Sequence, residues 1–155
     1  MGAVALGGVC VQNDDVIEQL GIDAPVIEAV MARELLEIER QAQLYRGSTE
    51  PPDVRGRTVI VVDDGLATGA TARAGLQALR EQHPAELVIA APVGSPHTVA
   101  MLRSFADDVV VDLMPDPLFA VGVWYRHFGQ TSDEEVKSAL CMKRPSRTWE
   151  DRHAV

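Results

Sequence analysis

Three short apolar runs, separated by helical segments, constrain the fold of this sequence more than any other feature. The runs cover residues 58–62, 87–93 and 109–113, and the segments between them, 71–82 and 96–105, carry apolar side chains at helical spacing. Strands that alternate with helices join through right-handed crossovers, and continuous apolar runs indicate strands buried on both faces. The sequence therefore predicts an α/β fold of the Rossmann-like kind. It is an open, mostly parallel sheet with flanking helices, and its ligand binds beyond the carboxyl ends of the strands.

The rest of the chain divides at glycine, proline and capping signals. The expected segments are a strand or short hairpin over residues 3–11, a short helix over 13–20, a long helix over 25–45, an exposed loop over 46–57, an aromatic-bearing loop over 115–129 and a final helix over 132–140. In the last of these, Ser132 and Glu135 have the spacing of a capping box. We expect residues 1–142 to form one domain and residues 143–155 to be a flexible tail.

Composition and charge exclude several classes of function. Lys plus Arg number 14 against 23 Asp plus Glu, giving a formal charge of −9, which opposes contact with a nucleic-acid backbone. No run of 18 apolar residues is present, so no membrane partner is expected. Cys10 and Cys141 lie far apart without metal-ligand spacing, so neither a zinc site nor a disulfide framework is indicated. These features favour a soluble protein of the reducing cytoplasm.

The strongest chemical signal is the segment VIVVDDGLATGAT at residues 59–71. It combines a buried strand, two adjacent carboxylates, a turn with glycines and threonines, and the start of a helix. Such a turn presents unpaired backbone N–H groups at a helix N-terminus, where a phosphate monoester fits. The carboxylates of Asp63 and Asp64 precede it and could accept hydrogen bonds from vicinal hydroxyls or border a Mg²⁺ ion. The pattern predicts a sugar 5-phosphate ligand.

These residues resemble the phosphoribosyl-pyrophosphate (PRPP) signature of type I phosphoribosyltransferases. Residues 25–140, including FAVGVWYRHFGQTSDEEV at 119–136, are similar to a bacterial group of predicted phosphoribosyltransferases. The resemblance implies that Asp63 and Asp64 act catalytically on the ribose hydroxyls, that Mg²⁺ accompanies the pyrophosphate, and that a nitrogen of an acceptor base displaces pyrophosphate from C1. It implies PRPP and a base as small-molecule partners, and it leaves a homo-oligomer open. The residues expected to bind the 5-phosphate are Leu66, Ala67, Thr68, Gly69, Ala70 and Thr71.

Two departures from the family pattern limit this interpretation. Ala67 stands where 6-oxopurine enzymes carry a further acid, which disfavours hypoxanthine or guanine as acceptor. Type I enzymes also have a strand and a pyrophosphate-binding loop well before the signature, and we expect this chain to begin after that element. The alternative function is therefore a non-catalytic PRPP-binding regulator or a truncated relic of the family.

Other residues have two competing interpretations. Asp63 and Asp64 could simply form an Asx turn at the end of a strand. Arg33, with Arg40 and Arg46, could meet pyrophosphate or could pair with neighbouring acids such as Glu37. Trp124, with Tyr125, could stack on a base or pack against the protein. We expect Gly69 to lack a side chain because the backbone approaches the phosphate closely there.

Overall fold

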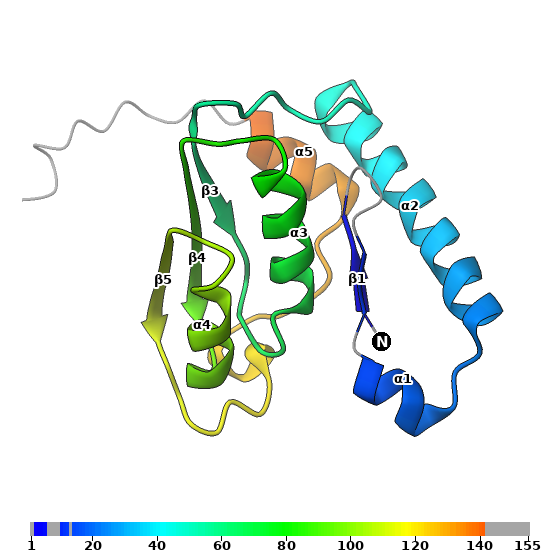
Figure 1. Ribbon diagram of the computed structural model, residues 1–155. Coiled ribbons are helices and arrows are strands. Elements are labelled where there is room, and N and C mark those ends of the chain that lie inside the picture. Colours follow the sequence, from blue (N-terminus) through cyan, green and yellow to red (C-terminus); the bar gives the residue numbers. More distant parts are fainter. Residues whose placement is uncertain (1, 6–9, 13, 142–155) are drawn as a thin grey trace, which may run out of the picture.

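The structure is a computed structural model that describes residues 2–5, 10–12 and 14–141 (Figure 1). The predicted tail, residues 143–155, and Asn13, the first residue of the predicted short helix, lie outside the described residues. The elements are β1 (Gly2–Val4), β2 (Cys10–Gln12), α1 (Asp14–Leu20), α2 (Ala24–Arg46), β3 (Thr58–Val62), α3 (Ala70–Arg80), β4 (Glu86–Val93), α4 (Pro96–Leu102), β5 (Asp108–Leu113), the 3-10 turn η1 (Val121–Trp124) and α5 (Asp133–Cys141).

The strands β3, β4 and β5 form a parallel sheet in that order. Val61 lies opposite Ile89, and Ile89 lies opposite Val109. This arrangement confirms the predicted α/β fold with its parallel strands and intervening helices. The helices differ slightly from the expected bounds: α3 begins and ends a little earlier, and α4 stops at Leu102 rather than near Phe105.

One face of the sheet, which we call the covered face, packs against α3 and α4 and holds the core (Figure 1). Leu87 and Ile89 on β4 are fully buried, and Leu76 of α3 and Leu102 of α4 pack in the same cluster. Alternate residues of a strand point to the same side, so the covered face is set by residues of one parity. Its members are Val59, Val61, Leu87, Ile89, Ala91, Val109 and Val111.

The opposite face, which we call the bare face, is exposed over the described part of the chain. The exposed fractions of Ile60, Val62 and Val110 are 63%, 75% and 52%. The prediction that these strands are buried on both faces is therefore wrong, because no helix of the described residues covers this side. The other bare-face positions carry Val88, Ala90 and Pro92 near the middle and polar residues nearer the strand ends, namely Thr58, Glu86, Asp108 and Asp112. A shallow hollow of about 380 Å³ lies over β4 and β5 there.

The N-terminal strands form an antiparallel pair that lies against α3, and α2 lies beyond that pair (Figure 1). Ala3 pairs with Val11, which confirms the predicted hairpin; its Gly7-Gly8 centre lies outside the described residues. The helix α2 has 23 residues, yet Ala42 is its only buried side chain. It ends at Gly47, whose φ of 72° is the left-handed conformation favoured by glycine at a helix C-terminus.

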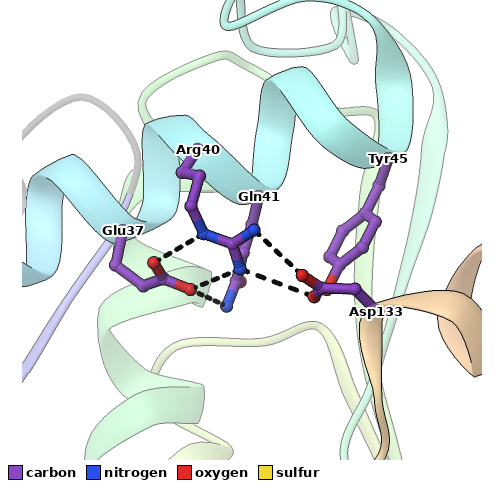
Figure 2. Close-up of polar contacts among 5 residues, drawn as sticks. All are labelled: Glu37, Arg40, Gln41, Tyr45 and Asp133. Carbon is purple, nitrogen blue, oxygen red and sulfur yellow. Dashed lines mark hydrogen bonds and ion pairs between the residues drawn. The ribbon is translucent and has the colours of Figure 1, made fainter.

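A polar cluster joins α2 to α5 (Figure 2). Arg40 donates to Glu37 at 2.8 Å and to Asp133 at 2.9 Å, Tyr45 donates to Asp133, and Gln41 donates to Glu37 at 2.9 Å. Asp133 is the first residue of α5, so the cluster fixes where this helix begins relative to α2. The start of α5 is also capped as expected, because Ser132 and Glu135 exchange hydrogen bonds.

Candidate functional site

The turn between β3 and α3 is anchored by Leu66 at the carboxyl end of the sheet. Its N–H donates to the Val93 carbonyl at 2.9 Å, and its own carbonyl accepts from the Ser95 N–H at 2.9 Å. The Leu66 side chain is fully buried in the core. Leu66 therefore holds the turn onto β4, and its N–H is already engaged, so the predicted contact to phosphate moves to the residues that follow.

Those following residues present a run of free backbone donors. Among the residues that the structure describes, the N–H groups of Ala67 through Thr71 donate to no protein acceptor. The Arg73 N–H is engaged, bonding to the Gly69 carbonyl at 2.8 Å. The side chains of Thr68 and Thr71 are exposed beside these donors. Unpaired N–H groups at the start of an 11-residue helix combine donors with the positive end of the helix dipole, which suits an anion.

Gly69 is required by the turn itself. Its φ is 73°, and a Cβ built there would lie 2.6 Å from Cγ2 of Thr98. The missing side chain would thus point into the protein toward α4. The expected reason for Gly69, a close approach of the phosphate to this α-carbon, is corrected to a backbone conformation and a tight packing contact.

The acid pair divides into two different environments. Asp63 is half-buried, and one of its carboxylate oxygens accepts the N–H of the next residue, Asp64, at 2.8 Å. Burial raises the pKa of the Asp63 carboxyl above its ordinary value, and the neighbouring charge of Asp64 raises it further. Asp64 is exposed at the end of the sheet. Asp63 shapes the turn, while the Asp64 carboxylate is open to a ligand.

Two hydroxyl groups from distant parts of the chain hold carbonyls of the same turn. The Tyr125 hydroxyl donates to the Asp64 carbonyl at 2.6 Å, and the Thr98 hydroxyl donates to the Ala67 carbonyl at 2.5 Å. The sequence analysis named Tyr125 only as a stacking candidate and did not find Thr98. A serine-proline pair at the start of α4 signals the helix, but nothing in the sequence signals its contact with a turn 31 residues away.

The other predicted site residues lie at different distances from this turn. Trp124 is 47% exposed and immediately precedes Tyr125, so it lies on the side of the acid pair. Arg33 is exposed on α2 and pairs with Glu34 at 2.9 Å. Arg40 is engaged by Glu37 and Asp133, and Arg46 lies in the last turn of α2. A role of these arginines toward pyrophosphate stays a prediction.

A cavity of about 520 Å³ lies between the β1–β2 pair, α2 and the start of α3. Its walls include Ile27, Met31 and Ile38, and Thr71 lies at its border with the turn. Cys10 contributes its thiol, which is 3.7 Å from the Met31 sulfur. Nothing in the sequence predicted this cavity.

The sequence profile described as the phosphoribosyl transferase domain matches residues 3–127. The chain belongs to the phosphoribosyl transferase domain family. The resemblance of the acid pair and the turn to phosphoribosyltransferases is thereby confirmed at the level of the family. The assignment of individual residues within this phosphoribosyl transferase domain stays a prediction.

Relatives of the phosphoribosyl transferase domain cover most of this chain. "Putative phosphoribosyl transferase Rv0571c" of Mycobacterium tuberculosis is 42% identical over 139 residues, which are 90% of this chain and 31% of that protein. "Bifunctional protein PyrR" of Roseiflexus is 34% identical over 57% of this chain and 49% of that protein. The crystal structure of TT1426 from Thermus thermophilus is 34% identical with a TM-score of 0.63, covering 88% of this chain and 64% of that one. The chain thus spans about a third of the length of the mycobacterial relative.

Proposed function

We propose that this chain binds PRPP or ribose 5-phosphate at the turn between β3 and α3, and transfers the phosphoribosyl group to a nitrogen acceptor with release of pyrophosphate. One observation carries the proposal: within the described part of the chain, unpaired N–H groups from Ala67 to Thr71 follow three residues after the exposed carboxylate of Asp64. The first group suits a phosphate and the second suits sugar hydroxyls. Membership of the phosphoribosyl transferase domain family supports the same ligand.

Mg²⁺ fits this site as an ion completed by the substrate. Among the described residues, no group of three or more His, Cys, Asp and Glu side chains converges on one point. Mg²⁺ is commonly held by one or two carboxylates together with substrate phosphates and water. Asp64, and the second oxygen of Asp63, would supply those carboxylates. When bound, the ion would neutralise charge on the departing pyrophosphate.

Each part of the site would then act on a different part of the substrate. The N–H groups of the turn hold the 5-phosphate, and the two carboxylates accept hydrogen bonds from the ribose hydroxyls and so fix the direction of C1. A carboxylate close to the ring also favours the positive charge that develops on the sugar as the bond to pyrophosphate breaks. Trp124 would border the acceptor. The reaction would proceed in the cytosol, where the thiols of Cys10 and Cys141 stay free.

A non-catalytic PRPP-binding protein is the second candidate. Expelling pyrophosphate needs donors that stabilise a highly charged leaving group. Arg33 and Arg40, two of the three arginines expected to serve, are engaged by acidic neighbours in this structure. This observation favours binding with slow turnover, and the same turn and acid pair serve both candidates.

Calorimetry with ribose 5-phosphate and with PRPP, each with and without Mg²⁺, tests the shared part of the proposal. We expect Asp64→Asn to weaken binding by about 1.5–3 kcal/mol, because hydrogen bonds to a charged acceptor are lost. Asp108→Asn is the matched control, since Asp108 is an exposed aspartate at the opposite end of the sheet. Equal affinity of all three proteins would remove the assignment of the site.

Pyrophosphate release separates the two candidates. The chain would be incubated with PRPP, Mg²⁺ and a panel of purine and pyrimidine acceptors. Release that depends on one acceptor, and that Asp64→Asn reduces, supports the enzyme. Tight binding of PRPP without acceptor-dependent release supports the non-catalytic protein.

A further inference from the structure

The turn that forms the proposed site is tied to the protein at two of its carbonyl groups. The Tyr125 hydroxyl, from the segment after η1, donates to the Asp64 carbonyl at 2.6 Å. The Thr98 hydroxyl, from α4, donates to the Ala67 carbonyl at 2.5 Å, and the Ser95 hydroxyl lies 3.4 Å from the same oxygen. The two ties come from different segments of the C-terminal half and act on peptide groups three residues apart.

A carbonyl and the N–H of the next residue belong to one planar, trans peptide group, and they point in opposite directions. Fixing the Asp64 carbonyl therefore fixes the Gly65 N–H, which faces the Asp63 carboxylate. Fixing the Ala67 carbonyl toward α4 turns the Thr68 N–H away from α4 and into the free run of donors. Each tie thus controls a different half of the site: Tyr125 the acid pair and Thr98 the anion-binding N–H groups.

The packing around the ties leaves the turn little freedom to rotate. A Cβ at Gly65 would lie 2.6 Å from both γ-carbons of Val121, and a Cβ at Gly69 would lie 2.6 Å from Cγ2 of Thr98. Thr98 is 2% exposed, so its hydroxyl has no competing water. The Tyr125 ring packs against Phe128 with centroids 5.2 Å apart. The elements that carry the hydroxyls also contact the turn directly.

We propose that Tyr125 and Thr98 are positioning residues that orient the two halves of this site independently, Tyr125 for the ribose hydroxyls and Thr98 for the phosphate. The proposal rests on the proposed function for the identity of the ligand. It adds two residues that touch no substrate and act through the peptide groups of the turn.

The test measures two ligands against two conservative variants. Thr98→Val keeps the shape of the side chain and removes the hydroxyl. We expect it to weaken the binding of inorganic phosphate and of ribose 5-phosphate by a similar factor of about 3–10, which corresponds to the loss of one hydrogen bond. Tyr125→Phe keeps the ring, and we expect it to weaken ribose 5-phosphate by about 3–10-fold and phosphate by less than about twofold. Thr98→Ser restores the hydroxyl and should bind both ligands nearly as the parent does.

Tyr45→Phe is the matched control, because it removes a tyrosine hydroxyl that binds Asp133 between α2 and α5. It should leave both affinities unchanged. A second measurement needs no variant: in the parent chain, the NMR signal of the Thr68 amide should shift with phosphate alone, and that of the Gly65 amide should shift only with ribose 5-phosphate.

The outcomes separate this inference from the proposed function. Three results would overturn the inference and leave the site in place. Both variants could bind both ligands as the parent does, Tyr125→Phe could lose affinity equally for both ligands, or the Gly65 amide signal could respond to phosphate alone. A parent chain that binds no ribose 5-phosphate overturns the proposed function, and the inference falls with it. Ligand-specific losses with rescue by Thr98→Ser support it.

Discussion

The two faces of the parallel sheet differ in how deeply their side chains are buried. On the covered face, Ile89 is fully buried beneath α3 and α4, whereas Ile60, a neighbouring isoleucine on the bare face, is 63% exposed. The middle positions of both faces carry aliphatic side chains, so an aliphatic row alone does not decide which face holds the core. The packed helices decide it: the free energy of burial is gained only where a second layer removes water from the strand.

The first prediction compares these two isoleucines directly. Ile89→Ala should lower the free energy of unfolding by about 2–5 kcal/mol, since it opens a cavity in packed surroundings. Ile60→Ala should cost about 1 kcal/mol or less, which reflects strand preference alone. Urea titration followed by circular dichroism measures both. Equal losses would mean that the bare face is covered in solution, for example by another copy of the chain.

The acid pair continues the same alternation beyond β3, and this leads to the second prediction. Asp63 follows the parity of the covered face and has a raised pKa, whereas Asp64 follows the bare face. If the ionised Asp63 carboxylate accepts a ribose hydroxyl, affinity for ribose 5-phosphate should fall as the pH drops through that raised pKa, by up to about tenfold per pH unit. This dependence of the affinity on pH should disappear in Asp63→Asn. Binding that is flat with pH in the parent would separate Asp63 from the ligand.

The third prediction is that ionisation of the Asp63 carboxyl lowers the free energy of unfolding, although it favours ligand binding. A raised pKa means that folding favours the protonated acid, so this contribution is complete below the ordinary pKa of an aspartate and is lost as the pH rises through the raised value. At neutral pH, Asp63→Asn should therefore raise the free energy of unfolding, by about 1 kcal/mol or less because the group keeps partial contact with water. Asp64→Asn should raise it by less, because this exposed substitution removes only the repulsion between the two carboxylates. Thermal unfolding of the parent and of both variants at pH 7 and pH 4 measures this. A lower stability of Asp63→Asn at pH 7 would contradict the prediction.

The smallest expected effect on stability concerns the bare face itself. The double variant Ile60→Lys, Val62→Lys should change the free energy of unfolding by only about 0.5 kcal/mol, because both side chains already contact water. It should nevertheless reduce self-association, since an exposed aliphatic patch promotes contact between molecules. Sedimentation velocity over a range of concentrations distinguishes the variant from the parent. Ile89→Lys is the contrasting control and should not fold stably.

The sequence predicts this fold well where the signal is local. The runs at β3, β4 and β5 combine β-branched residues with flanking helix signals, and the strand-to-helix turn at Asp63 and Asp64 has a distinctive spacing, so both were predicted correctly as elements. Local patterns cannot report what lies against a strand. The apolar run of β3 looks the same whether one face or both are packed, which is why its burial was predicted wrongly.

The contacts that shape the site show the same limit. Tyr125 lies 61 residues from the carbonyl that it binds, and Thr98 lies 31 residues away from its own. Such pairings depend on how helices and loops pack on the sheet, and no periodicity encodes them. The acid pair and the turn could be found because one short segment carries them. The groups that orient the turn could not be found in the same way.

The attachment of α2 has a mechanical consequence. The helix is 23 residues long, or about 34 Å, and its polar cluster with α5 lies in the C-terminal half at Arg40 and Tyr45. The cavity beside β1 runs along most of the helix, from Ile27 to Gln41, so this side of α2 is not closely packed. The contacts with Asp133 are therefore the point about which the helix would rotate, and its N-terminal end would move most. Ala24 lies 16 residues, or about 24 Å, from Arg40, so a rotation of about 10° at the polar cluster would displace it by roughly 4 Å. High salt screens the exposed Arg40 ion pairs and would therefore let α2 move more freely, while the apolar packing of the sheet stays intact.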